Sequence, residues 1–241
     1  FGKDNRADRL ITYAASFGNT TLEKLEKYQK AGEVGNLLKE FDAISVRDAN
    51  SGSIVEQFTG EEPVYNLDPV LTYDYMNCCD RIPQIEATEK YLILYAYAGR
   101  ISNEEADWIA EYAKKKNLKV YAIGGIQKCA DRFVDCSPFE VLAYFRNAEE
   151  VITDTFHGSI FSVITHRPFA TLIRKSVGNS YGNEEKLSDL LNRLGLTERM
   201  TTKVEETEHI NQQPIDYEKV DDVLQKQREI AKAYLCQSIG E

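Results

Sequence analysis

Short apolar runs alternate with helical patterns along this 241-residue chain. In its first third, apolar runs at residues 11–15, 43–46 and 63–67 are separated by helical patterns at 22–38 and 51–58. A strand followed by a helix and another strand forms a parallel sheet, because the helix carries the chain back across one face of the sheet. The alternation therefore predicts the α/β class.

A polar stretch at residues 72–90, rich in tyrosine and aspartate, interrupts this alternation. We interpret it as a connection between two α/β units. Beyond it, strands are predicted at 91–95, 119–123, 150–153 and 169–173, and helices at 103–116, 138–147, 160–164, 184–193 and 217–234. We therefore expect a first domain at 1–75, a linker at 76–90, a second domain at 91–200 and a C-terminal tail with a helix at 201–241.

Helix starts are marked by a serine or threonine followed three residues later by a glutamate. In this capping box the hydroxyl and the carboxylate each accept a hydrogen bond from a backbone N–H that the helix leaves unpaired. The pattern occurs at Thr20 with Glu23, Ser102 with Glu105, and Ser137 with Glu140.

The composition limits the classes of function. A net charge of −10 argues against a broad nucleic-acid-binding surface. No apolar run reaches the roughly 18 residues that a membrane-spanning helix needs. The five cysteines form no C-x-x-C pair and the three histidines lack zinc-type spacing, so we expect reduced thiols in the cytoplasm and no metal site. The chain opens at Phe1 without an initiator methionine, and we expect it to be cut from a longer protein.

The segment at residues 150–162 places a tight polar turn between an apolar strand and an apolar helix. It sets His157 at the N-terminus of the helix, beside backbone N–H groups that have no partner within the helix. Such a position suits an anion and an acid–base catalyst together. We take His157 as the candidate catalytic residue; the alternative is a histidine that only caps the helix.

Two polar neighbours flank this histidine. Asp154 is a candidate substrate-binding residue that can orient a neighbouring group, although capping the helix or fixing the turn is the favoured role. Ser159 offers a hydroxyl and a first-turn N–H, and both can hold a phosphate oxygen.

Arg47 follows the strand predicted at 43–46, where ligands bind in open α/β sheets. Its guanidinium matches a carboxylate or phosphate in bidentate geometry. The alternative is a surface ion pair with Asp48 or Asp42, which contributes little energy.

Three more polar residues follow predicted strands. Ser16 comes after the strand at 11–15, and Arg174 and Lys175 come after the strand at 169–173. We take all three as candidate substrate-binding residues, and a solvated strand end is the alternative for the two cations.

In several segments the chain resembles the polysaccharide pyruvyl transferase family. The most specific is NAEEVITDTFHGSIFS at residues 147–162. Weaker segments are YAASFG at 13–18, ISVRD at 44–48, LDPV at 67–70, SPFE at 137–140 and LLNRLGL at 190–196. They follow one another in order from residue 11 to about residue 200.

This resemblance implies a GT-B-like architecture of two Rossmann-type halves, with the N-terminal half incomplete here. It implies transfer of a pyruvyl group from phosphoenolpyruvate to a glycan or lipid-linked sugar, without a metal or organic cofactor. His157 is then tied to the donor and to acid catalysis, and Arg47 to the anionic groups of the donor.

The resemblance also places Thr155 and Gly158 among the donor-binding residues. Some members carry arginine where this chain has Thr155, so Arg174 or Lys175 is expected to supply the second positive charge.

Two other functions stay open at this point. One is a GT-B glycosyltransferase that uses a nucleotide sugar, since it shares the architecture and a phosphate site at a helix end. The other is a truncated, non-catalytic module that binds an anion or a glycan. The sequence leaves the acceptor sugar and the oligomeric state undefined.

Overall fold

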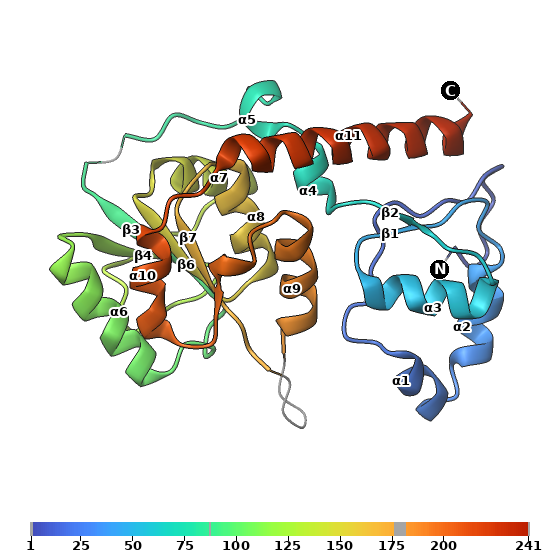
Figure 1. Ribbon diagram of the computed structural model, residues 1–241, viewed down its shortest axis with the longest axis horizontal. Helices are drawn as coiled ribbons and strands as arrows, with labels where there is room; N and C mark the ends of the chain where they lie inside the picture. The colour runs from blue at the N-terminus through green and yellow to red at the C-terminus, as the bar shows by residue number, and fades with distance from the viewer. Residues whose placement is uncertain (1, 87, 176–181, 241) are drawn as a thin grey trace. The chain divides into compact units, whose positions relative to one another are not determined.

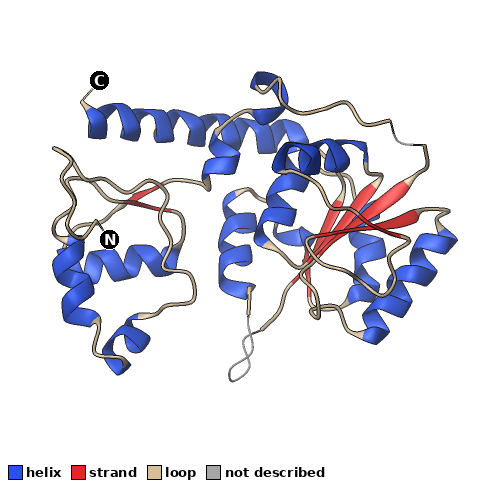
Figure 2. Ribbon diagram, turned by 180° about the vertical axis from the view of Figure 1, so that it is seen from behind, coloured by secondary structure: helices blue, strands red, loops and turns tan. Residues whose placement is uncertain are grey.

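The computed structural model describes residues 2–86, 88–175 and 182–240. The chain divides into two compact units, one made of Phe1–Tyr73 with Asp221–Glu241 and the other of Asp74–Val220 (Figures 1 and 2). Both units contain parallel sheet, so the predicted α/β class is confirmed.

The second unit is built on a six-stranded sheet in the order β5-β4-β3-β6-β7-β8. Every neighbouring pair in it is parallel. Its strands are β3 Tyr91–Tyr95, β4 Lys119–Ile123, β5 Arg132–Phe133, β6 Glu150–Thr153, β7 Phe169–Leu172 and β8 Met200–Thr201. The chain runs outward from β3 through β4 to β5, returns to β6 on the other side of β3, and then runs outward in the opposite direction. The order therefore reverses between β3 and β6.

Helices cover both faces of this sheet (Figure 2). On one face, Ile109 and Ala113 of α6 (Asn103–Lys115) pack with Leu92 and Leu94 of β3 in a buried cluster. On the other, the Tyr95 ring meets Phe145 of α7 (Pro138–Asn147) edge-on, with ring centres 5.8 Å apart. The other α-helices that lie wholly in the described part of this unit are α5 Tyr75–Cys78, α8 Phe156–Ile164, α9 Glu184–Arg193 and α10 Thr207–Gln212, and short 3-10 helices lie at Thr197–Arg199 and Val204–Glu206.

The first unit has a small parallel sheet of β1 (Ser45–Val46) and β2 (Val64–Tyr65). The strand predicted at 11–15 is present only as two parallel bridges, from Ile11 to Ala43 and from Ala15 to Val46. A buried polar link ties these segments together, since the Ser45 hydroxyl accepts from the Ala14 N–H at 3.0 Å and from the Asn66 amide at 2.6 Å.

The helices of the first unit differ in detail from the prediction. The pattern at 22–38 forms two helices, α1 (Leu22–Lys27) and α2 (Ala31–Leu38), because the chain turns at Gln29 with a φ of 55°. The cap of α1 is Thr21 rather than Thr20, and its hydroxyl accepts from the Lys24 N–H at 3.3 Å. The other helices there are α3 Ala49–Thr59 and α4 Pro69–Thr72, and the stretch at 72–90 contains α5.

The expected tail at 201–241 is divided between the two units. Thr201 belongs to β8 of the larger sheet, whereas α11 (Tyr217–Ile239) enters the first unit from Asp221 onward. There the Tyr234 hydroxyl donates to the Thr12 carbonyl at 2.6 Å. Local periodicity predicts a helix but not its packing partner, which explains the difference.

Two predicted capping boxes are confirmed, at Ser102 with Glu105 and at Ser137 with Glu140. In the second, the Glu140 N–H donates to the Ser137 hydroxyl at 3.4 Å and the Glu140 carboxylate accepts from the Ser137 N–H at 2.8 Å.

We expect Ser137→Ala to lower the free energy of unfolding by about 1 kcal/mol, because an N–H at the start of α7 loses its acceptor. Urea unfolding followed by circular dichroism measures the change. Ser53→Ala is the matched control, since Ser53 is exposed within α3. An equal effect of the two substitutions would contradict the capping role.

Candidate functional site

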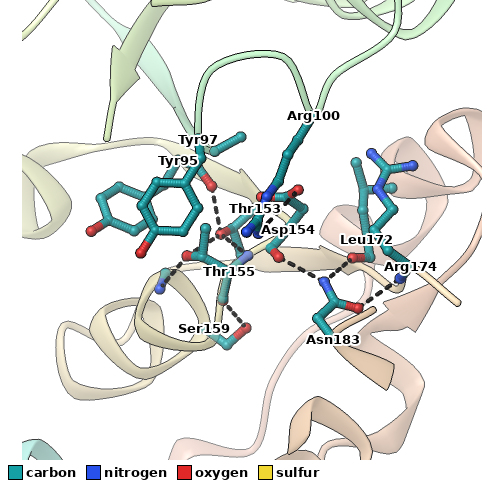
Figure 3. A network of polar contacts seen from close by, with 12 residues as sticks. Tyr95, Tyr97, Arg100, Thr153, Asp154, Thr155, Ser159, Leu172, Arg174 and Asn183 are labelled. Atoms are coloured by element: carbon teal, nitrogen blue, oxygen red, sulfur yellow. Dashed lines mark hydrogen bonds and ion pairs between the residues drawn. The ribbon is translucent and has the colours of Figure 1, made fainter. Parts of the chain in front are cut away.

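The carboxyl ends of β3 and β6 lie side by side where the strand order of the larger sheet reverses. In open α/β sheets, ligands bind at such a switch point because the loops leave the two strands in opposite directions and open a crevice. The loop after β3 carries Tyr97 and Arg100, and the turn after β6 carries Asp154 and Thr155 (Figure 3). His157 follows two residues after Thr155.

Threonine hydroxyls fix where α8 begins. Thr153, the last residue of β6, donates its hydroxyl to the Tyr95 carbonyl at 2.7 Å and accepts from the Thr155 N–H at 3.0 Å. The Thr155 hydroxyl accepts from the Gly158 N–H at 2.9 Å and so forms the N-cap. The helix start is thereby bonded to the ends of both central strands (Figure 3).

His157 lies in the first turn of α8 and is half-buried. Its ring lies against Phe156 and Phe161, with centre-to-centre distances of 5.6 and 5.9 Å. The imidazole therefore lies against two aromatic rings, partly exposed, at the positive end of a helix.

Gly158 and Ser159 serve the turn itself. A Cβ on Gly158 would lie 2.1 Å from the Thr153 hydroxyl oxygen, so only glycine fits there. Ser159 is fully buried, and its hydroxyl lies 2.9 Å from that of Thr171 on β7. The sequence suggested this hydroxyl as a phosphate ligand; the structure shows it joining α8 to the sheet instead.

Asp154 is fully buried at the same turn. Neither carboxylate oxygen has a hydrogen-bond partner among the described residues, and the nearest cation is Arg100, whose Nη1 lies 3.9 Å from Oδ2. Burial raises the pKa of this carboxyl to about 6, while Arg100 and then Arg174 oppose the rise. The sequence favours Asp154 as the cap of this helix, but the N-cap of α8 is Thr155.

Arg174 is held by a carboxylate. Its two terminal nitrogens donate to the two oxygens of Glu105 at 2.6 and 3.2 Å. The same Glu105 closes the capping box of α6 by accepting from the Ser102 N–H at 2.9 Å. Lys175 is exposed.

Asn183 connects the ends of β6 and β7. Its amide donates to the carbonyls of Asp154 at 2.7 Å and Leu172 at 3.2 Å, and its oxygen accepts from the Arg174 N–H at 2.6 Å. Asn183 and Arg100 are not among the residues predicted from the sequence, and Glu105 is predicted only as part of a capping box. Only the position of Arg100 just after a predicted strand could have drawn attention to it.

The two candidates in the first unit follow its short strands. Among the described ion pairs, that of Arg47 is with Asp68, a buried residue just after β2, rather than with Asp48 or Asp42. Asp48 instead caps α3 by accepting from the Ser51 N–H at 2.8 Å. The hydroxyl of Ser16 accepts from the Gly18 N–H at 3.0 Å and closes the turn there.

Comparison with protein families gives a match to the model described as polysaccharide pyruvyl transferase, over residues 3–176. Among curated proteins, none matches the chain.

Solved structures resemble the chain weakly. An O-GlcNAc transferase mutant from Thermobaculum terrenum is 15% identical, with 83% of this chain and 42% of that chain covered and a TM-score of 0.39. The chain thus spans less than half the length of that protein. The glycotransferase of kitacinnamycin is 11% identical, with 87% of this chain and 66% of that chain covered and a TM-score of 0.43. The glycosyltransferase SnogD from Streptomyces nogalater is 8% identical, with 88% of this chain and 71% of that chain covered and a TM-score of 0.36.

We expect Gly158→Ala to lower the free energy of unfolding by about 1–3 kcal/mol, because the added methyl group overlaps the Thr153 hydroxyl in a packed turn. Gly32→Ala is the control, since a Cβ there meets nothing within 4 Å. Chemical unfolding measures both, and a Gly158→Ala protein as stable as the control would contradict the packing described.

We expect Asp154→Asn to stabilise the protein at pH 8 by on the order of 2 kcal/mol. The folded-state pKa lies above the ordinary value of 3.8, so the stability that Asp154 contributes at low pH is lost as the pH rises through about 6. The advantage of the asparagine variant should therefore shrink as the pH falls from 7 to 5. Thermal unfolding across this range measures it, and an advantage independent of pH would contradict a buried, titrating carboxyl.

Proposed function

The chain belongs to the polysaccharide pyruvyl transferase family, and from this premise we propose that it transfers a pyruvyl group from phosphoenolpyruvate to a sugar of a glycan. The acceptor is a glycan or a lipid-linked sugar with two hydroxyls close enough for both oxygens to bond to the same carbon of the pyruvyl group, which closes a ring. The products are a pyruvate ketal and inorganic phosphate.

The chemistry needs a proton donor. One sugar oxygen bonds to C2 of phosphoenolpyruvate while the methylene carbon takes up a proton and becomes a methyl group. A second sugar oxygen then bonds to C2, and the bond from C2 to the phosphate oxygen breaks. The two hydroxyls release two protons, of which one balances the proton taken up by the methyl group and the other is taken up by the departing phosphate.

The observation that carries this proposal is the position of His157, half-buried in the first turn of α8 at the switch point of the larger sheet. A protonated imidazole is the side chain best suited to deliver a proton near neutral pH. We assign this proton transfer to His157. The bonds of Thr153 and Thr155 hold the helix start in one place and so support this role.

Phosphoenolpyruvate carries a phosphate and a carboxylate, and both need positively polarised partners. The N-terminus of α8 offers one. In the first unit, Asp68 keeps the Arg47 guanidinium in place at the end of β1, which supports the role that the family resemblance gives to Arg47. Lys175 adds an exposed positive charge after β7.

No described helix combines the length and the apolar character that crossing a membrane requires.

We expect His157→Ala to reduce the rate of ketal formation by at least about 100-fold, because general acid catalysis contributes factors of that size. His209→Ala is the control, since His209 is exposed on α10. Phosphate release from phosphoenolpyruvate, measured with a panel of hexose and N-acetylhexosamine glycosides, gives the rate. Mass spectrometry of the sugar detects the ketal.

Full activity of His157→Ala would exclude the acid role. Binding of UDP- or GDP-sugars, with no binding of phosphoenolpyruvate, would replace the proposal by a glycosyltransferase that uses nucleotide sugars. Binding of phosphoenolpyruvate without phosphate release from any acceptor would favour a binding module over an enzyme.

A further inference from the structure

Arg100 is presented by a tight turn at the end of β3. Its N–H donates to the Tyr97 carbonyl at 3.3 Å, and Gly99 supplies the positive φ of 77° that this turn needs. The guanidinium carbon lies 4.6 Å from the centre of the Tyr97 ring. The turn brings the side chain to the same edge of the sheet as the start of α8 (Figure 3).

The loop after β4 holds this turn in place. The Gln127 amide donates to the carbonyls of Ala96 at 3.0 Å and Tyr97 at 3.4 Å. A Cβ on Gly125 would lie 2.3 Å from the Ala98 nitrogen, so the two backbones meet closely. The guanidinium of Arg100 is therefore carried by rigid backbone.

Asp154 lies opposite Arg100 (Figure 3). Its buried carboxylate has no hydrogen-bond donor among the described residues, which is costly unless a positive charge compensates. Arg174 is committed to Glu105 through two short hydrogen bonds. Arg100 forms an ion pair with Asp154 at 3.9 Å, which is too long for a hydrogen bond, and a quarter of its side chain is exposed (26%).

We propose that Arg100 binds an oxyanion of the donor and that Asp154 is the positioning residue that holds its guanidinium beside the start of α8. This inference rests on the proposed function for the identity of the donor. It makes Arg100, rather than Arg174, the second positive charge of the donor site. A guanidinium can face the Asp154 carboxylate on one edge and a phosphate or carboxylate on another, because its five N–H donors point in several directions.

Asp154 is negatively charged and could affect the binding of an anion in two ways. Its charge could repel the anion directly, or its carboxylate could hold the Arg100 guanidinium in place, and the two predict opposite effects of removing the charge. Removing the negative charge of Asp154 should strengthen the binding of an anion if the carboxylate acts only through its field. It should weaken binding if the carboxylate is needed to place Arg100. The effect of Asp154→Asn should then vanish when Arg100 is already absent, as in a double-mutant cycle.

The test measures the dissociation constant of phosphoenolpyruvate by calorimetry at pH 7.5 for the whole chain. We expect Arg100→Met to weaken binding at least about tenfold, because hydrogen bonds between charged groups are lost. Arg100→Lys should restore part of the loss. Asp154→Asn should weaken binding by a smaller factor, and the double variant should bind no more weakly than Arg100→Met.

Arg132→Met is the matched control, since Arg132 also lies over a tyrosine ring of this unit, 5.4 Å from the centre of Tyr121. It should change binding less than twofold. Circular dichroism confirms that each variant is folded. Titrations with inorganic phosphate and with pyruvate show which oxyanion Arg100 contacts, because only one of the two should weaken in Arg100→Met.

Equal binding by Arg100→Met and the unchanged protein would overturn the inference and leave the proposed function standing. Tighter binding by Asp154→Asn would overturn the positioning role. If the unchanged protein binds no phosphoenolpyruvate, the proposed function fails, and the inference then stands only if Arg100→Met weakens the binding of phosphate or pyruvate. Binding of none of the three would overturn both.

Discussion

The hydroxyl of Thr153 is the contact on which the site depends. It donates to the end of β3, accepts from the turn after β6 and leaves no room for a side chain at position 158. A helix start that is bonded to two neighbouring strands can shift neither along the sheet nor away from it. His157 gains a defined position from these bonds and from the rings of Phe156 and Phe161. Sites built on strand ends and a capped helix are rigid for this reason.

The turn that fixes the start of α8 also buries the carboxylate of Asp154, which lowers the stability of the folded protein. A fully buried carboxylate with no hydrogen-bond donor among the described residues destabilises the folded protein. Three polar or charged neighbours leave it without a hydrogen bond. Asn183 donates only to its backbone carbonyl, Arg174 is bonded to Glu105, and Arg100 stays 3.9 Å away. Groups with strongly shifted pKa values in a crevice are typical of functional sites. The destabilisation caused by burying Asp154 fits a carboxylate that is kept because it positions Arg100.

Local patterns predicted the parts of the fold that local chemistry decides. The α/β alternation, the capping boxes at Ser102 and Ser137 and the strand–turn–helix around His157 all follow from neighbouring residues. Pairings that depend on strand order were missed. Arg100 and Asp154 meet because β3 lies next to β6, which no local pattern encodes. The hydroxyl of Ser159 was assigned to a ligand for the same reason, because Thr171 reaches it from another strand.

The central claim is that the imidazole at the start of α8 meets the donor. The chain has only three histidines, so their ring protons give a simple nuclear magnetic resonance spectrum that single substitutions assign. We predict that titration with phosphoenolpyruvate shifts the ring resonances of His157 in a saturable way and leaves those of the exposed His209 in place. Saturable binding of phosphoenolpyruvate with no change at His157 would contradict the account.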